Sequence, residues 1–101
     1  MTYSVKLIVY ATDDPRVESS VRAALEAPGA TIQEFGTRKT GDGENELYAE
    51  IRLSDRRHLD QILRGVEAVK GAAVMAATTP KEIRPAGRGG GSTLSTDRKS
   101  G

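Results

Sequence analysis

Apolar and polar side chains alternate along three stretches of the chain, and a period of two residues is typical of strands with one buried face. In the first stretch, Val5, Leu7 and Val9 fall on the side that we expect to be buried. Gly36 interrupts the second stretch, which either weakens the prediction of a strand or marks a bulge. A fourth, shorter apolar stretch completes the set of expected strands, which are residues 3–11, 31–39, 47–53 and 72–78.

Two further segments carry apolar residues three or four positions apart, which predicts amphipathic helices. The first helix is expected to begin after a cap at Asp13 or Asp14 and to end at Pro28-Gly29. The second is expected to begin at Ser54 as its cap and to end before Gly71. Their apolar faces carry Val17, Val21, Ala24 and Leu25 in the first helix and Leu59, Ile62, Leu63 and Val66 in the second.

The resulting order β-α-β-β-α-β predicts an α+β fold, the ferredoxin-like two-layer sandwich. Its antiparallel four-stranded sheet has the order 4-1-3-2, with both helices on one face. The other face is then bare, and we expect Ile8, Tyr10, Tyr48 and Phe35 on it. An apolar patch of this kind usually serves for dimerisation or binding.

The expected core combines the buried sides of the strands with the apolar faces of the helices. It contains Val5, Leu7 and Val9 of the first strand and Leu47, Ala49 and Ile51 of the third strand. The apolar helical residues named above also belong to it, except Ala24. Large aliphatic side chains become rare after residue 80, so we place the domain at residues 1–79 and a disordered Gly-rich basic tail at residues 80–101.

Composition excludes several kinds of chemistry. The 101 residues include no cysteine, which removes disulfides, thiolate metal sites and cysteine nucleophiles and fits the reducing cytoplasm. No apolar run is long enough to cross a bilayer, so we expect no membrane insertion. Residues 81–101 carry five basic and two acidic residues, a balance of +3, which leaves ten basic and twelve acidic residues, or −2, on residues 1–80. We therefore do not expect the folded part to bind nucleic acid.

Candidate catalytic and metal-binding residues are few. His58 is the only histidine, and a metal site needs several converging ligands. The adjacent acids Asp13 and Asp14 fit helix capping better than acid–base catalysis. Ser19, Ser20 and Ser54 lack the glycines and the histidine of a nucleophile site. We therefore expect no enzyme activity, no metal and no cofactor.

Six strings of the sequence carry a resemblance to a known family, at residues 3–10, 12–15, 28–32, 49–53, 58–63 and 69–72. Together with the order of the elements, they resemble the ACT and ACT-like regulatory domains. The resemblance implies a non-enzymatic regulatory or oligomerisation domain of a larger bacterial-type protein. Two parents are similar over this region: the RelA/SpoT-type stringent-response synthetases, with a C-terminal ACT domain, and the MgtC/SapB-type membrane proteins, with a C-terminal ACT-like domain.

The resemblance also implies where a small ligand would bind. Family members use the loop after the first strand and the start of the second strand, and we expect the topology to bring these two segments together. The family loop resembles Asp-Arg-Pro-Gly-Leu, whereas Arg16 stands here in place of the glycine. The candidate ligand residues are Asp13, Asp14, Arg16, Gly29, Ala30 and Thr31.

The expected partners are a second copy of the chain in a weak homodimer, neighbouring domains of a parent protein, and a small-molecule ligand. Ile8, Tyr10 and Tyr48 are the expected interface residues. The alternative is a ferredoxin-like module that binds a protein or RNA, since Tyr10 and Tyr48 lie in the strands that carry stacking aromatics in RNA-recognition modules.

Overall fold

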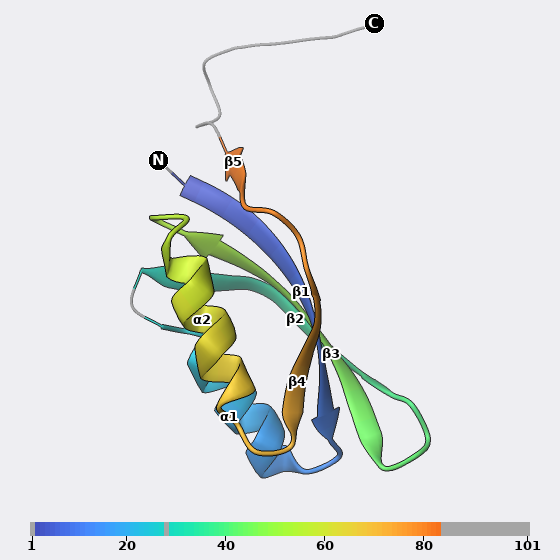
Figure 1. Ribbon diagram of the computed structural model, residues 1–101. Helices are drawn as coiled ribbons and strands as arrows, with labels where there is room; N and C mark the ends of the chain where they lie inside the picture. Colours follow the sequence, from blue (N-terminus) through green and yellow to red (C-terminus); the bar gives the residue numbers. More distant parts are fainter. Residues whose placement is uncertain (1, 28, 84–101) are drawn as a thin grey trace, which may run out of the picture.

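A computed structural model describes residues 2–27 and 29–83 as a single sheet with two helices packed on one of its faces (Figure 1). The sheet is antiparallel, with the strand order β2-β3-β1-β4 and a short β5 that also pairs with β1. The predicted ferredoxin-like order and topology are thereby confirmed. The elements are β1 (Thr2–Thr12), α1 (Pro15–Leu25), β2 (Ala30–Lys39), β3 (Glu44–Leu53), α2 (His58–Glu67), β4 (Ala72–Ala77) and β5 (Lys81–Ile83).

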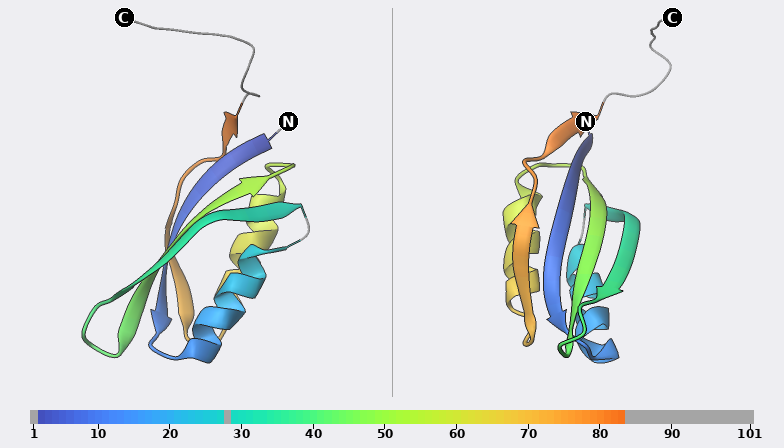
Figure 2. Two further views of the ribbon diagram at one scale, coloured as in Figure 1. Left: turned by 180° about the vertical axis from the view of Figure 1, so that it is seen from behind. Right: turned by 90° about the vertical axis from the view of Figure 1, so that its right-hand side faces the viewer.

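Strand β1 lies at the centre of the sheet and sets the register of its neighbours. It pairs with β3 from Tyr3 opposite Leu53 to Thr12 opposite Glu44. Because β2 and β3 are also antiparallel, β1 and β2 run in the same direction, and β2 begins at the level where β1 begins. Both helices lie on one side of the sheet, and no element of the described residues covers the other side, which we call the bare face (Figure 2).

The ordered sheet continues past the domain boundary that the sequence suggested at residue 79. The backbone N–H of Thr78 donates to the Lys6 carbonyl and its hydroxyl oxygen accepts from the Lys6 N–H, and Lys81–Ile83 then pair with Thr2–Ser4 as β5. Three residues are too few to produce a recognisable periodicity, which is why the pattern did not indicate this strand. The rest of the expected tail, residues 84–101, lies outside the described residues.

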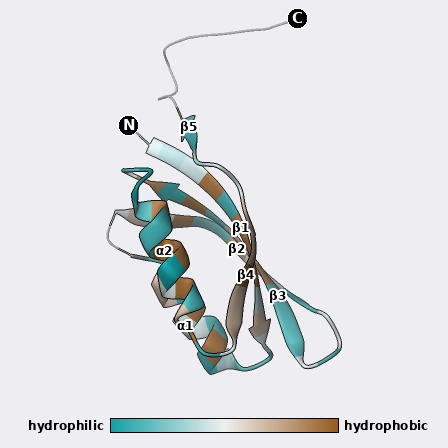
Figure 3. Ribbon diagram, in the orientation of Figure 1, coloured by the Kyte–Doolittle hydropathy of each residue, from teal (hydrophilic) through white to brown (hydrophobic). Residues whose placement is uncertain are grey.

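The core between the helices and the sheet largely follows the prediction. Val17, Leu59 and Leu63 were expected inside it but are only partly buried at its rim, whereas Ala11 and Leu53 are fully buried. On α2, Ile62 and Val66 point into the sheet because they are four residues apart on one face. Figure 3 shows hydrophobic and hydrophilic residues alternating along both helices, as this amphipathic packing requires.

A β-bulge in β2 changes the face on which its side chains lie. The pairing of β2 with β3 shifts by one residue between Ile32 and Glu34, so Phe35 pairs with Ala49 and lies on the helix side. There it packs against the core, and the Arg22 guanidinium lies 4.8 Å from its ring centroid. The expectation that Phe35 lies on the bare face is therefore wrong, because the extra residue inverts the alternation.

The starts of the two helices differ. Asp14 caps α1 as predicted: its Oδ1 accepts a hydrogen bond of 2.8 Å from the Arg16 backbone N–H. Helix α2 begins only at His58, with no side-chain cap. Ser54 instead donates a hydrogen bond from its backbone N–H to the Gly29 carbonyl, so its expected role as the cap of α2 is wrong.

Neither helix has the length and apolar composition that a bilayer crossing requires among the described residues.

Candidate functional site

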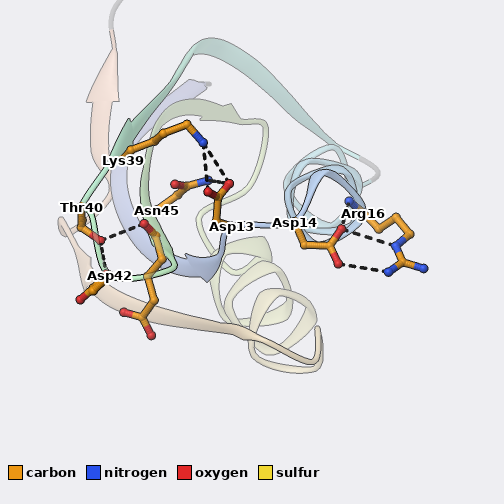
Figure 4. A network of polar contacts seen from close by, with 8 residues as sticks. Asp13, Asp14, Arg16, Lys39, Thr40, Asp42 and Asn45 are labelled. Carbon is orange, nitrogen blue, oxygen red and sulfur yellow. Dashed lines mark hydrogen bonds and ion pairs between the residues drawn. The ribbon is translucent and has the colours of Figure 1, made fainter.

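The carboxylate of Asp13 is the centre of a polar cluster at one end of the sheet (Figure 4). The Lys39 ammonium donates to both of its oxygens, at 3.0 and 3.1 Å, and the Asn45 Nδ2 donates to Oδ1 at 3.1 Å. The backbone N–H of Asp13 donates to the Gly43 carbonyl at 2.9 Å. These contacts join the loop after β1 to both strands of the β2–β3 hairpin.

Local sequence explains why the hairpin presents Lys39 and Asn45 together. The two residues face each other in register as the last pair before the turn. Within the turn, Gly41 and Gly43 have φ values of 88° and 82°, a conformation that side chains disfavour. The Thr40 hydroxyl donates to Asp42 at 2.6 Å or to the Glu44 carbonyl at 2.8 Å, which closes the turn.

The two adjacent acids are held in their charged forms by different neighbours. The hydrogen bonds from Lys39, and secondarily from Asn45, lower the pKa of Asp13 from its ordinary value of 3.8. The backbone N–H of Arg16, followed by its guanidinium, lowers the pKa of Asp14. Two ionised carboxylates with cationic partners do not form an acid–base pair that shares a proton, so this arrangement gives no support to catalysis.

A hollow of about 500 Å³ opens beside this cluster, between the start of α1 and the end of β2. Asn45 forms part of its wall, is 5 % exposed, and leaves its buried Oδ1 without a hydrogen-bond partner. A buried acceptor without a donor is uncommon in folded proteins. The wall consists of Asp13, Asp14, Pro15, Glu18, Ser19, Arg22, Thr37, Lys39 and Asn45.

The structure separates the two groups of expected ligand residues. Asp13, Asp14 and Arg16 lie together at the end of β1, as expected. Gly29, Ala30 and Thr31 lie at the opposite end of the sheet, where Ala30 pairs with Leu53, itself opposite Tyr3. Ten residues of strand separate the two ends, roughly 30 Å. The expectation that the topology brings them together is wrong, because β1 and β2 run in the same direction and the end of one cannot meet the start of the other.

Sequence reasoning missed Lys39, Asn45 and Arg22, which complete the site at the end of β1. One signal was available: Asn45 occupies the first inward position of an alternating strand that continues with Leu47, Ala49 and Ile51. A polar residue at a core position indicates a specific hydrogen bond. Lys39 could then be identified as the residue that faces Asn45 across the hairpin turn.

The expected interface residues Ile8, Tyr10 and Tyr48 lie on the bare face of the sheet and are partly exposed. Ile8 pairs with Tyr48, which in turn pairs with Gly36. Tyr10 pairs with Glu46 one step further along β1. The bare face therefore carries a small apolar patch beside charged residues.

The described residues offer no cluster of three or more His and acidic side chains that could hold a metal ion. His58 lies at the start of α2, where its ring is within 2.8 Å of the position that a Cβ on Gly29 would take. It is thus a packing residue at the end of the sheet remote from Asp13.

Comparison with known proteins shows which folds the chain resembles. No family model matches the chain, and no curated protein matches its sequence. Among solved structures, the ACT domain from the GTP pyrophosphokinase of Chlorobium tepidum superposes with a TM-score of 0.61 at 12% identity, covering 77% of this chain and 97% of that domain. The chain has the ACT-like fold that the resemblance implied. The C-terminal domain of MgtC from Mycobacterium tuberculosis follows with a TM-score of 0.57 at 20% identity, covering 75% of this chain and 83% of that one.

A third similar structure shows how little the fold alone says about function. The de novo designed protein Foldit4 has a TM-score of 0.53 at 22% identity and covers 78% of this chain and 98% of its own. The same ACT-like arrangement is thus found in two natural domains and in a designed protein. Function must therefore be argued from the surfaces and sites of this particular chain.

Proposed function

We propose that this chain is a non-enzymatic regulatory module of a larger cytoplasmic protein, and that it works by associating with a second copy through the bare face of its sheet. Its fold is that of the ACT domain of a pyrophosphokinase and the C-terminal domain of MgtC. The proposal depends on one observation, the apolar row across the bare face.

This row crosses the four main strands of the sheet. Gly36 of β2 pairs with Tyr48 of β3, Tyr48 pairs with Ile8 of β1, and Ile8 pairs with Ala76 of β4. Apolar side chains gathered on an exposed sheet face favour an interface with another surface. A second copy of the chain presents the same row of residues for such an interface.

Charged residues flank the row on both sides. Lys6 pairs with Glu50 on one side, and Arg38 forms an ion pair of 2.7 Å with Glu46 on the other. A polar rim around a small apolar centre is typical of a transient interface. For a domain of this size the contact is limited, so we expect micromolar affinity that linkage within a parent protein would strengthen.

Sedimentation of the 101-residue chain between about ten micromolar and one millimolar tests this proposal. We expect a monomer–dimer equilibrium that Tyr10→Ser and Tyr48→Ser each shift toward monomer. Gln61→Ser, on the exposed side of α2, is the matched control and should leave the equilibrium unchanged. A chain that stays monomeric throughout would refute the proposal.

Sensing of a small ligand is a second candidate function, and the hollow beside Asp13 supports it. The unpartnered Asn45 Oδ1 could accept a hydrogen bond from a ligand donor, and Arg22 supplies a nearby positive charge. Titration with amino acids and nucleotides, followed by amide chemical shifts, is the test. We expect shifts at residues 12–16, Lys39 and Asn45, and none at residues 29–32. An absence of localised shifts at millimolar ligand would end this proposal.

Binding of RNA receives less support from the same face. Tyr10 and Tyr48 are partly exposed, but Glu46 and Glu50 lie beside them on β3. These carboxylates would repel a phosphate backbone. Binding of another protein domain fits the patch better than binding of RNA.

A further inference from the structure

Ser4 lies on the bare face of β1, between two strands that each place a basic residue beside it. It pairs with Arg52 of β3 on one side and with Lys81 of β5 on the other. Lys6 follows two positions along β1 and faces the same side, because side chains alternate along a strand. Neighbouring strands lie about 5 Å apart, so these three basic residues surround Ser4 at short range. We call Lys6, Arg52 and Lys81 the basic cluster.

The basic cluster has no carboxylate partner among residues 2–27 and 29–83. The five ion pairs of this part of the chain use other basic residues, which are Arg16, Arg38, Lys39, Arg57 and Arg64. Lys6 and Lys81 are exposed, and Arg52 is partly exposed, with a buried Nε that has no hydrogen-bond partner. Such an unpartnered group is uncommon in folded proteins. The guanidinium and the two ammonium groups therefore keep N–H donors for an acceptor from outside the chain.

One carboxylate among the described residues lies next to the basic cluster. Glu50 pairs with Lys6 and accepts a hydrogen bond of 3.1 Å from the Ser4 hydroxyl. Glu82 lies on the helix side of the sheet, and Glu34 lies one strand further from Ser4, opposite Glu50. Three positive charges against one negative charge leave a local excess of two. This excess matches a phosphate group, which carries about −1.5 to −2 charges at neutral pH.

A fourth residue extends the row through Ser4. Thr31 of β2 is exposed and pairs with Arg52, so a threonine, an arginine, a serine and a lysine cross the sheet on β2, β3, β1 and β5. Hydroxyl and guanidinium groups are suitable donors for phosphate oxygens. The row lies four residues along β1 from Ile8, roughly 13 Å, and is therefore separate from the apolar row of the proposed interface.

We propose that the basic cluster binds a phosphate group over Ser4, either as the free anion or as the monoester of a small molecule. The planar guanidinium of Arg52 presents paired N–H donors to two phosphate oxygens, and the ammonium groups of Lys6 and Lys81 act as point charges. The site goes beyond the proposed function and does not depend on self-association. It also lies roughly 30 Å along β1 from the hollow beside Asp13.

Titration of the 101-residue chain with inorganic phosphate measures this binding through amide chemical shifts, with the ionic strength held constant by sodium chloride. We expect saturable shifts at Ser4, Arg52 and Lys81. The expected dissociation constant is about one millimolar, because solvent and salt screen an exposed site. Shifts that sodium chloride alone reproduces, or an absence of localised shifts at millimolar phosphate, would refute the site.

Removal of single charges tests which residues hold the phosphate. Arg52→Gln and Lys81→Gln should each weaken phosphate binding about tenfold, since each removes a charge-assisted hydrogen bond. Lys70→Gln is the matched control, because it removes an exposed lysine at the other end of the sheet, next to the Gly71 carbonyl that binds Thr12. Far-UV circular dichroism verifies the fold of each variant, and the exposed Lys81 decides the matter if Arg52→Gln does not fold. Unaltered binding in either folded cluster variant contradicts the proposal.

Glycerol phosphate and glycerol distinguish the two sources of the phosphate group. Binding of glycerol phosphate at least as tight as that of inorganic phosphate supports a phosphorylated small molecule as the ligand. Tighter binding of inorganic phosphate supports the free anion. Equal shifts at Ser4 with glycerol and with glycerol phosphate would refute recognition of the phosphate group.

The outcomes for this site and for the proposed function are separable. Tyr48→Ser should leave phosphate binding unchanged although it shifts the chain toward monomer, and a loss of binding in this variant would refute an independent site. A monomeric native chain that binds phosphate refutes the proposed function alone. A chain that self-associates without binding phosphate refutes this inference alone.

Discussion

The ammonium group of Lys39, the last residue of β2, lies 3.0 Å from Oδ1 of Asp13, the first residue after β1. This contact connects the outer strand of the sheet with the loop that leads into α1. It is exposed to solvent, with side-chain exposures of 71% for Lys39 and 43% for Asp13. Solvent screens such a pair, so we expect it to position the loop more than to stabilise the fold.

Replacement of Lys39 with Met should raise the pKa of Asp13 toward 3.8, because the hydrogen bond from Lys39 is the largest cause of its depression. A depressed carboxyl pKa contributes stability above the unfolded value of 3.8 and loses it as the pH falls through the folded value. Lys39→Met should therefore lose stability at neutral pH and match the native chain in strong acid.

Carboxyl NMR titration of Asp13 and urea unfolding at neutral and strongly acidic pH measure these effects. Lys70→Met is the control, since it removes an exposed lysine outside the cluster. An unchanged Asp13 pKa in Lys39→Met would show that Asn45 alone holds the carboxylate.

Substitution of Gly29 with Ala should destabilise the chain more than substitution of Gly43. Both glycines have positive φ, 84° and 82°, so both changes carry a backbone cost of about 1–2 kcal/mol. At Gly29 the new Cβ would also lie 2.8 Å from the His58 ring, whereas at Gly43 it meets nothing within 4 Å. Urea unfolding compares the two, and equal losses would mean that His58 moves aside without cost.

Truncation of Ile62 to Ala should cost about 2–5 kcal/mol of unfolding free energy, since its side chain is 1% exposed within the core. Leu63→Ala is the matched control and should cost less, because Leu63 lies at the rim of the core. Chemical denaturation measures both. A larger loss at Leu63 would indicate that α2 is rotated about its axis.

Removal of residues 84–101 should leave the melting temperature within a few degrees, since the described sheet contacts lie within residues 2–83. Removal of Lys81–Ile83 as well should lower it by about 4–8 °C if the pairing with Thr2–Ser4 contributes about 1 kcal/mol. Thermal unfolding of the two truncated chains decides the question. Equal melting temperatures would mean that β5 adds nothing to stability.

The sequence was sufficient to predict the order of elements, the strand order and most of the core, because those depend on periods of two and of three to four residues. The separation of Gly29 from Asp13 follows from that same topology, because the first and second strands are both antiparallel to the third and therefore run in the same direction. The expectation that the two segments meet was inconsistent with the predicted sheet. The bulge at Gln33 and the strand β5 each involve one to three residues, too short a signal for a pattern of alternation. The partners of Asp13 required the register of the hairpin.

The extra residue in β2 reverses which of its residues face the helices. Before the bulge, even-numbered residues such as Ile32 face the helices, and after it odd-numbered residues such as Phe35 and Lys39 do. Deletion of Gln33 alone would remove the bulge without changing these faces, because Ile32 and Glu34 would then follow each other in regular pairing with Ile51 and Glu50. Deletion of Thr37, which lies beyond the bulge, would instead move Arg38 to the helix side and Lys39 to the other side of the sheet. The contact of Lys39 with Asp13 and the ion pair of Arg38 with Glu46 would then be lost together, although every residue that makes them would still be present.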